Sequence, residues 1–268
     1  MKRLVRTGWR RRRHSQIFLE VFSGSGHLSS AMKRRGFLVL RWDILNGESW
    51  DLLLRKNQQL IRGWLAEGVV AAIHIGTPCQ SLTRARDRGP IKAVGQTGWP
   101  SRLRSDEFPW GLPQLVNPPD LIAVRVGNQL ARFSASLLEH ARFYRVPCTV
   151  ENPAGSRLWI LPPFLKLART PEWRQIQTHF CMFGKPWKKA TTFGGFFVDL
   201  TPAARLCKGR AVCDRSKRPH QSCSGKAPDG RMWTKVAEPY PATLCNKLAA
   251  CFDESLGTAL TRRLQALW

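Results

Sequence analysis

Long hydrophobic runs are absent from this 268-residue sequence. No apolar stretch approaches the roughly 18 residues that a membrane-spanning helix needs. The charged N-terminal residues are not followed by a hydrophobic segment, so a secretory signal is not expected. These absences exclude a membrane protein from the classes considered, and no membrane partner is expected.

Acidic residues are few. The sequence has 18 Asp and Glu against 43 Lys and Arg, which gives a formal net charge of +25. Such a positive surface attracts polyanions over a long range, and nucleic acid is the first candidate partner, ahead of an acidic membrane surface. A basic arm at 1–15 fits a phosphate contact, a nuclear-import signal or a solvated tail.

The close cysteine spacing of a secreted disulfide scaffold is also missing. The eight cysteines are scattered through a long chain that is 43% hydrophobic, enough for a full core. We therefore expect reduced thiols in an intracellular protein, located in the nucleus of a eukaryotic host and otherwise in the cytoplasm.

Short apolar runs alternate with helical patterns through most of the chain. Runs typical of buried strands lie at 17–22, 37–43, 69–75 and 146–153, and two further strand-like stretches lie at 175–183 and 191–200. Apolar residues at helical spacing precede Gly36 and recur at 49–68 and 119–145. This alternation predicts an α/β fold, a Rossmann-like, doubly wound mixed sheet.

Two features at the ends of the first two predicted strands indicate a cofactor that carries a nucleoside, because open α/β sheets bind ligands there. In "VFSGSGHL" two glycines let the backbone approach a ligand, although the third glycine of G-x-G-x-x-G is missing. Asp43 is placed to accept hydrogen bonds from ribose hydroxyls, with a cap or turn role as the alternative. Asp51 is interpreted as the N-cap of the next helix.

A thiol and a carboxylate follow the third and fourth strands, in "GTPCQS" and "VENP". A Cys79 thiolate can add to one carbon of an aromatic ring while Glu151 hydrogen-bonds or protonates a ring nitrogen. Nearby arginines and the positive field are expected to favour the thiolate. Cys79 alone would be interpreted as a buried core thiol. Together with Pro78, Gln80, Glu151 and Asn152, it is interpreted as a nucleophile.

These motifs, in this order and at these spacings, resemble the DNA (cytosine-5)-methyltransferase family, in particular its phage and mobile-element members. The resemblance covers residues 17–198. It departs from the family pattern where "ENP" replaces "ENV" and where Lys188 and Lys189, in "FGKPWKKATTF", replace the arginines of a basic strand. It implies a class I methyltransferase domain at 16–200, a basic target-contact insert at 201–240 and a C-terminal helix at 241–268 that returns to the domain.

The resemblance also implies a role for each matching residue. Cys79 would attack carbon 6 of a flipped-out cytosine, Glu151 would contact nitrogen 3, and carbon 5 would take a methyl group from S-adenosylmethionine. The cofactor-binding residues would be Phe22, Gly24, Gly26, Leu28, Asp43, Asp51 and Pro78. The substrate-binding residues would be Gln80, Ser81, Arg84, Arg86, Arg88, Asn152, Lys188 and Lys189.

DNA is therefore the expected partner of a monomeric enzyme. An RNA cytosine methyltransferase is one alternative, and an inactive nucleic-acid-binding relic of a mobile element is another. The intact pair of Cys79 and Glu151 favours an active enzyme over the relic.

The basic segment "CKGRAVCDRSKRPHQSC" allows two interpretations. Its spacing lacks the C-x2-C knuckle of a standard zinc finger, so a basic DNA-facing loop with incidental thiols is favoured. The alternative is a zinc site made by Cys207, Cys213, His220 and Cys223.

Overall fold

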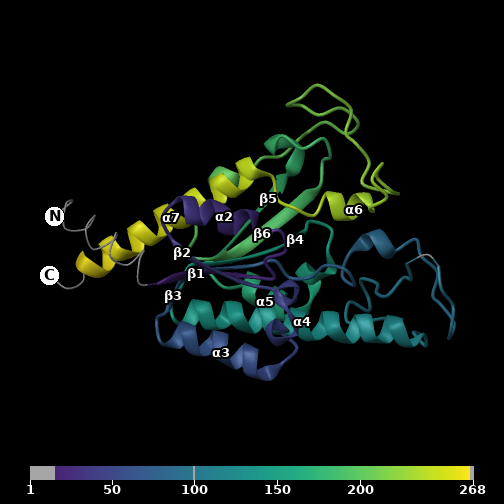
Figure 1. Cartoon of the computed structure of the whole chain (residues 1–268), viewed down its shortest axis with the longest axis horizontal. Coiled ribbons are helices and arrows are strands. Elements are labelled where there is room, and N and C mark those ends of the chain that lie inside the picture. Colours follow the sequence, from purple (N-terminus) through teal and green to yellow (C-terminus); the bar gives the residue numbers. More distant parts are fainter. Residues whose placement is uncertain (1–15, 99, 266–268) are drawn as a thin grey trace.

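The computed structural model describes residues 16–98 and 100–265. The basic arm predicted at 1–15 lies outside this range. Figure 1 shows the described chain as a central sheet with helices on both sides and long loops beyond one end. The carboxyl ends of the parallel strands lie near these loops, so this end of the sheet is where a ligand site is expected.

The sheet has six strands in the order β2-β1-β3-β4-β6-β5. β1 to β4 are parallel, and β6 runs antiparallel between β4 and β5. This mixed, doubly wound sheet confirms the predicted α/β class. The strands are β1 (Ile17–Val21), β2 (Leu38–Trp42), β3 (Val70–Ile75), β4 (Cys148–Pro153), β5 (Trp173–His179) and β6 (Ala190–Phe196).

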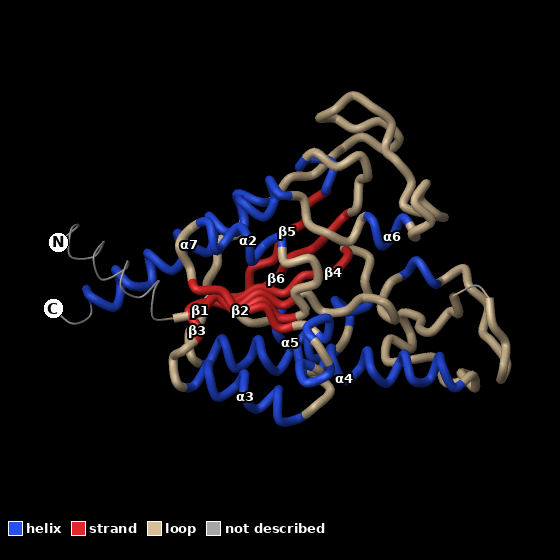
Figure 2. Tube along the Cα trace, viewed as in Figure 1, coloured by secondary structure: helices blue, strands red, loops and turns tan. Residues whose placement is uncertain are grey.

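Helices cover both faces of the sheet, as Figure 2 also shows. On one face, α3, α4 and α5 bury side chains such as Leu65 and Leu137 against the strands. On the other face, α2 and α7 build a second core, in which the Phe18 and Phe252 rings meet edge to face at 5.1 Å. The helices are α2 (His27–Arg34), α3 (Arg55–Ala66), α4 (Pro118–Phe143), α5 (Pro162–Ala168), α6 (Trp233–Val236) and α7 (Ala242–Gln265).

The helix predicted at 49–68 is shorter than expected. α3 begins only at Arg55, and Leu54 is its N-cap. Asp51 lies before that point, and its Oδ1 accepts a hydrogen bond from the Leu53 N–H at 2.8 Å. Asp51 therefore caps a local turn, and its interpretation as a helix N-cap is wrong.

The two longest helices pack on opposite faces of the sheet. α4 has 26 residues and α7 has 24. α7 lies beside α2, and its Phe252 contacts Phe18 of β1, so the end of the described chain packs against the elements that begin it. Within the described residues, no helix combines the length and the apolar character needed to cross a membrane.

Candidate active site

The turn between β1 and α2 is held by two buried carboxylates. Gly24 and Gly26 have φ values of +46° and +66°, a region that favours glycine. The Gly24 N–H donates to Asp43 Oδ2 at 2.8 Å, and Leu45 N–H donates to Asp43 Oδ1 at 2.9 Å. Glu20 Oε2 accepts the Ser29 N–H at 2.9 Å in the first turn of α2. Asp43 thus has the turn role, which the sequence allowed as an alternative to a ribose contact.

The side chains predicted to line a cofactor fall into two groups. Phe22, which follows β1 at φ 57°, and Pro78 are half-buried at the strand ends. Leu28, also predicted to bind the cofactor, is fully buried in the core shared with α7, so its side chain does not face the strand ends. The large apolar side chains of Ile44 and Leu45, directly after Asp43, are exposed near the same strand ends.

The sheet brings the predicted nucleophile and carboxylate side by side. β3 and β4 are adjacent parallel strands in which Ile75 pairs with Val150. Glu151, the next residue on β4, therefore lies beside the point where the chain leaves β3 toward Cys79. The buried Asn152 fixes this junction, because its Nδ2 donates to the Thr77 carbonyl at 2.7 Å. Asn152 therefore holds the two strand ends together through the backbone.

The protonation of this pair differs from the expectation. Burial raises the pKa of the Cys79 thiol, the Glu151 charge raises it further, and Lys189 lowers it. The expectation that nearby arginines favour the thiolate is wrong: Lys189 is the cation that acts on Cys79, and Arg84 instead pairs with Asp106 at 2.8 Å. Burial also raises the pKa of Glu151, which Lys189 and Tyr240 lower in part.

A chain of hydrogen bonds that the sequence did not reveal connects Glu151 to three further side chains. The Tyr240 hydroxyl donates to Glu151 Oε2 at 3.1 Å and lies 3.1 Å from His74 Nε2. His74 Nδ1 lies 2.7 Å from the Thr149 hydroxyl, and burial lowers the His74 pKa to about 3, so its ring is neutral. A proton on Nε2 gives every donor in this chain an acceptor. His74 is thus the satisfied core histidine that its apolar strand suggests.

The loop after Cys79 contains the next group of predicted substrate contacts. Gln80 and Arg88 are exposed. Arg84 is paired with Asp106, and Arg86 Nε donates to the Ser101 carbonyl at 2.8 Å. Both arginines therefore brace the loop itself.

Ser81, predicted to contact the substrate, is buried against Arg104, a residue that the sequence did not indicate. Arg104 is 1% exposed. Its Nε donates to the Ser81 carbonyl at 2.8 Å and its Nη2 to Ser81 Oγ at 2.9 Å. Further donations reach the Pro109 carbonyl and Asn128 Oδ1, each at 2.7 Å. This planar fork connects the loop that follows Cys79, residues 101–112 and α4.

The two lysines at the predicted basic strand lie just before β6 and point to different segments. Lys189 Nζ donates to the carbonyls of Ala237 and Glu238, at 3.0 and 3.3 Å. Lys188 Nζ donates to the Gly209 carbonyl at 2.8 Å. Lys189 also lowers the pKa of both Cys79 and Glu151, whereas Lys188 contacts the segment 204–232.

Three of the four predicted metal ligands converge, together with one that was not predicted. Cys223 is not in this group; it packs against the core beside α7, and Cys181 takes its place. Cys181 follows β5 directly, on a turn that carries no local ligand spacing, so the sequence could not indicate it. The four residues, called the Cys/His cluster below, are Cys181, Cys207, Cys213 and His220.

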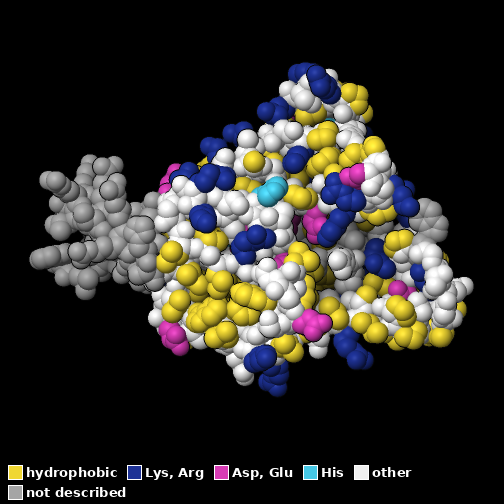
Figure 3. All heavy atoms as spheres, in the orientation of Figure 1, with side chains coloured by type: hydrophobic (Ala, Val, Ile, Leu, Met, Phe, Trp, Pro, Cys, Tyr) yellow, Lys and Arg dark blue, Asp and Glu magenta, His cyan; other side chains and the backbone are white. Residues whose placement is uncertain are grey.

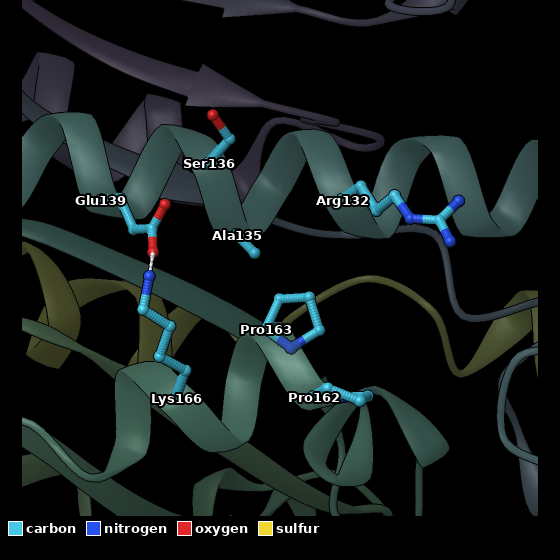
Figure 4. Close-up of a pocket in the computed structure, with 7 residues that line it drawn as sticks. All are labelled: Arg132, Ala135, Ser136, Glu139, Pro162, Pro163 and Lys166. Carbon is cyan, nitrogen blue, oxygen red and sulfur yellow. Dashed lines mark hydrogen bonds and ion pairs between the residues drawn. The ribbon is translucent and has the colours of Figure 1, made fainter.

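A pocket of about 410 Å³ lies away from these groups (Figure 4). All its lining residues come from α4 and α5, and the Lys166–Glu139 ion pair of 3.1 Å joins the two helices there. None of the strand-end residues lines it. The pocket is therefore separate from the candidate active site.

Comparisons with known proteins add little to this description. No protein-family model and no curated sequence matches the chain. A crystal structure of a triple mutant of DNMT2 from Spodoptera frugiperda is similar at 15% identity and a TM-score of 0.33, over 67% of this chain and 49% of that one. The chain thus spans about half the length of that structure. The Rossmann-like assignment is based on the strand order and directions given above.

Proposed function

We propose that this protein transfers a methyl group from S-adenosylmethionine to carbon 5 of cytosine in DNA, through a covalent bond to Cys79. The observation that carries the proposal is the placement of Cys79 and Glu151 at the ends of adjacent parallel strands, close enough for the Glu151 charge to raise the thiol pKa. The glycine turn that follows β1 lies at the same edge of the sheet.

Cys79 and Glu151 have different roles in this reaction: Cys79 supplies an electron pair and Glu151 supplies a proton. The Cys79 thiol first loses its proton to water. The sulfur then donates its electron pair to carbon 6, and the ring electrons shift toward nitrogen 3, which receives a proton from Glu151. Carbon 5 would then form a bond to the methyl group as the methyl–sulfur bond of bound S-adenosylmethionine breaks and S-adenosylhomocysteine leaves. A water molecule accepts the carbon 5 proton, the double bond re-forms and the thiolate leaves, while nitrogen 3 returns its proton to Glu151. Burial raises the pKa of Glu151, which favours its role as the proton donor.

The turn after β1 offers a place for the cofactor. A Cβ at Gly24 would meet open space, so a ligand can approach the backbone there. Asp43 lies beneath this turn, and the 52% and 75% exposed Ile44 and Leu45 present apolar surface to a flat ring. S-adenosylmethionine bound here would supply an electrophilic methyl group.

Nucleic acid as substrate is supported by charge. The formal charge of the chain is +25, and Figure 3 shows lysine and arginine side chains gathered over the loop that projects from the sheet. Exposed Gln80 and Arg88 lie on the loop that follows Cys79, where a flipped base and its flanking phosphates would sit.

The test is incubation with labelled S-adenosylmethionine and either DNA or RNA, followed by nucleoside analysis. We expect labelled 5-methylcytosine from DNA. Cys79→Ser should abolish the label while binding is retained, and Cys223→Ser is the matched thiol control. Label in RNA alone would assign the enzyme to RNA, and binding without label on either substrate would identify an inactive binder.

A further inference from the structure

The Cys/His cluster joins two parts of the chain that are distant in sequence. One ligand comes from the turn after β5, and the other three come from the segment 204–232. The four ligand atoms all lie within 4.8 Å of one another, and Cys207 Sγ is 3.6 Å from His220 Nε2. The three sulfurs belong to side chains that are 1–3% exposed.

These separations are close to those of a tetrahedral metal site. Zn–S bonds of about 2.3 Å and Zn–N bonds of about 2.0 Å, at tetrahedral angles, place a sulfur and a nitrogen roughly 3.6 Å apart. The Cys207–His220 separation has this value. A shift of well under 1 Å per ligand would bring the remaining atoms to roughly the 3.8 Å expected between two sulfurs.

The surroundings orient the ligands toward a common centre. The other ring nitrogen of His220, Nδ1, lies 3.1 Å from the Arg210 carbonyl, so a proton on Nδ1 is satisfied there and leaves the Nε2 lone pair facing the thiols. The Asp214 N–H donates to Cys207 Sγ at 3.4 Å, the kind of contact that stabilises a thiolate. The imidazole and the thiol are therefore held as ligands before any metal binds.

The segment 204–232 has little else to hold it in place. Its buried apolar side chains, in the described structure, are Cys207, Cys213 and Ala227, whereas Leu206 and Val212 are 53% and 47% exposed. It carries eight lysines and arginines against two acids. Regular structure within it consists of two isolated bridges, yet a Cβ at Gly209 would overlap the Val212 carbonyl, so the chain is tightly folded. A segment with so few buried apolar side chains gains stability from a cross-link or a metal.

We propose that the Cys/His cluster binds one Zn²⁺ ion as a structural site. Three thiolates and one imidazole suit zinc, and four protein ligands leave no open position for catalysis. The closeness of the three thiols is not due to a disulfide, because all eight cysteines are free thiols. The site would carry a net charge of −1, which the basic segment around it offsets.

The metal would fix the basic segment to the β5–β6 hairpin. Lys188, just before β6, already donates to the Gly209 carbonyl of that segment, and the Gln221 N–H donates to the Pro186 carbonyl at 3.0 Å. The site therefore positions a basic surface beside Lys189 and the candidate active site. This inference holds whether or not the proposed reaction occurs.

The first test is the metal content of the purified full chain, measured by mass spectrometry of the elements after purification without chelator. We expect one zinc per chain in the wild type and in Cys223→Ser, and less than a tenth of that in Cys181→Ser. Cys223 is the matched control because it lies in the same sequence region and outside the cluster. A wild type that stays without zinc after exposure to Zn²⁺ would overturn the proposal, as would equal loss in both variants.

A second test needs no variant and so does not depend on variant folding. The wild-type protein, stripped by chelator under reducing conditions, is titrated with Co²⁺ and its absorption is recorded. One equivalent should produce thiolate-to-cobalt charge-transfer bands and tetrahedral visible bands, both abolished by one equivalent of Zn²⁺. In alkylation followed by peptide mapping, zinc should protect Cys181, Cys207 and Cys213 and leave Cys223 reactive. The absence of charge-transfer bands, or equal protection of all four thiols, would contradict the site.

Discussion

At the scale of single residues, the charge of Glu151 limits the ionisation of Cys79. Burial and the Glu151 charge both raise the pKa of the thiol, so the resting nucleophile holds its proton at neutral pH. Glu151, itself buried, resists losing the proton that nitrogen 3 would need. The thiolate must therefore form as the substrate binds.

This coupling predicts how Cys79 reacts with iodoacetamide as pH changes. A raised pKa means that alkylation is slow at pH 7 and accelerates as the pH rises through the pKa of the thiol. Glu151→Gln removes the negative charge and should move the curve to lower pH. Lys189→Met should move it to higher pH, because Lys189 is the cation that lowers the pKa.

The measurement is peptide mapping of Cys79 over a pH series. Lys188→Met is the matched control, since Lys188 precedes Lys189 directly and donates to Gly209, away from the thiol. Its curve should coincide with the wild type. A Glu151→Gln curve displaced to higher pH would contradict the coupling.

Tyr240 is the residue through which the C-terminal part of the chain acts on Glu151. Tyr240→Phe would leave Glu151 Oε2 and the buried His74 Nε2 without this partner, which we expect to lower the free energy of unfolding by about 1–3 kcal/mol. It should also raise the pKa of Glu151, because the Tyr240 hydrogen bond lowers it.

Urea unfolding of Tyr240→Phe can be compared with Tyr144→Phe, a change at the other tyrosine of the chain, which is 36% exposed. The Tyr144 variant should stay within about 0.5 kcal/mol of the wild type. Equal stabilities for the two variants would refute a structural role for the Tyr240 hydroxyl.

At the scale of elements, close packing of α4 against the loop after Cys79 fixes the position of that loop in the candidate active site. A Cβ at Gly127 in α4 would collide with Ser81 Oγ and meet Arg104 Nη2 at 3.1 Å. Gly127→Ala should therefore displace this loop, destabilise the protein by about 1–3 kcal/mol and reduce methyl transfer.

Gly63→Ala is the matched change in a neighbouring helix, α3. The nearest atom to its Cβ would be Glu67 Oε1 at 3.9 Å, an ordinary contact. Here the helix propensity of alanine should stabilise the protein by about 0.5–1 kcal/mol. Thermal unfolding of both variants checks the opposite signs, and two changes of the same sign would contradict this packing argument.

The sequence was sufficient to predict the elements whose signals are local. β1 and β3 are buried on both faces, so they are mostly apolar runs. The order of strands and helices placed Cys79 and Glu151 at one edge. The start of α3 was misjudged because Leu52 to Leu54 continue its apolar pattern while forming a turn.

The residues that were missed act through contacts between distant segments. Tyr240 reaches Glu151 across 89 positions, and Arg104 reaches Ser81 from a loop without periodicity. Cys181 joins the Cys/His cluster from another element altogether. Such contacts are set by the tertiary fold, and neither spacing nor composition indicates them.

At the scale of the whole molecule, the net charge of +25 should dominate nucleic-acid binding. Each phosphate neutralised by the protein releases counterions, so the logarithm of affinity should fall linearly with the logarithm of salt concentration. With about six phosphate contacts, affinity should fall about 10³-fold between about 50 and 200 mM salt.

Fluorescence anisotropy with a labelled duplex measures this slope. Arg88→Gln removes an exposed charge on the loop after Cys79 and should reduce the slope by about one. A flat plot would show that phosphates do not dominate binding.

The most direct measurement of the central claim is covalent trapping on DNA that contains 5-fluorocytosine. Fluorine at carbon 5 replaces the proton that must leave, so the adduct formed after methyl transfer persists. We predict a stable protein–DNA adduct that requires S-adenosylmethionine, maps to the peptide containing Cys79 and is absent in Cys79→Ser. No cofactor-dependent adduct, or an adduct on another cysteine, would contradict the account.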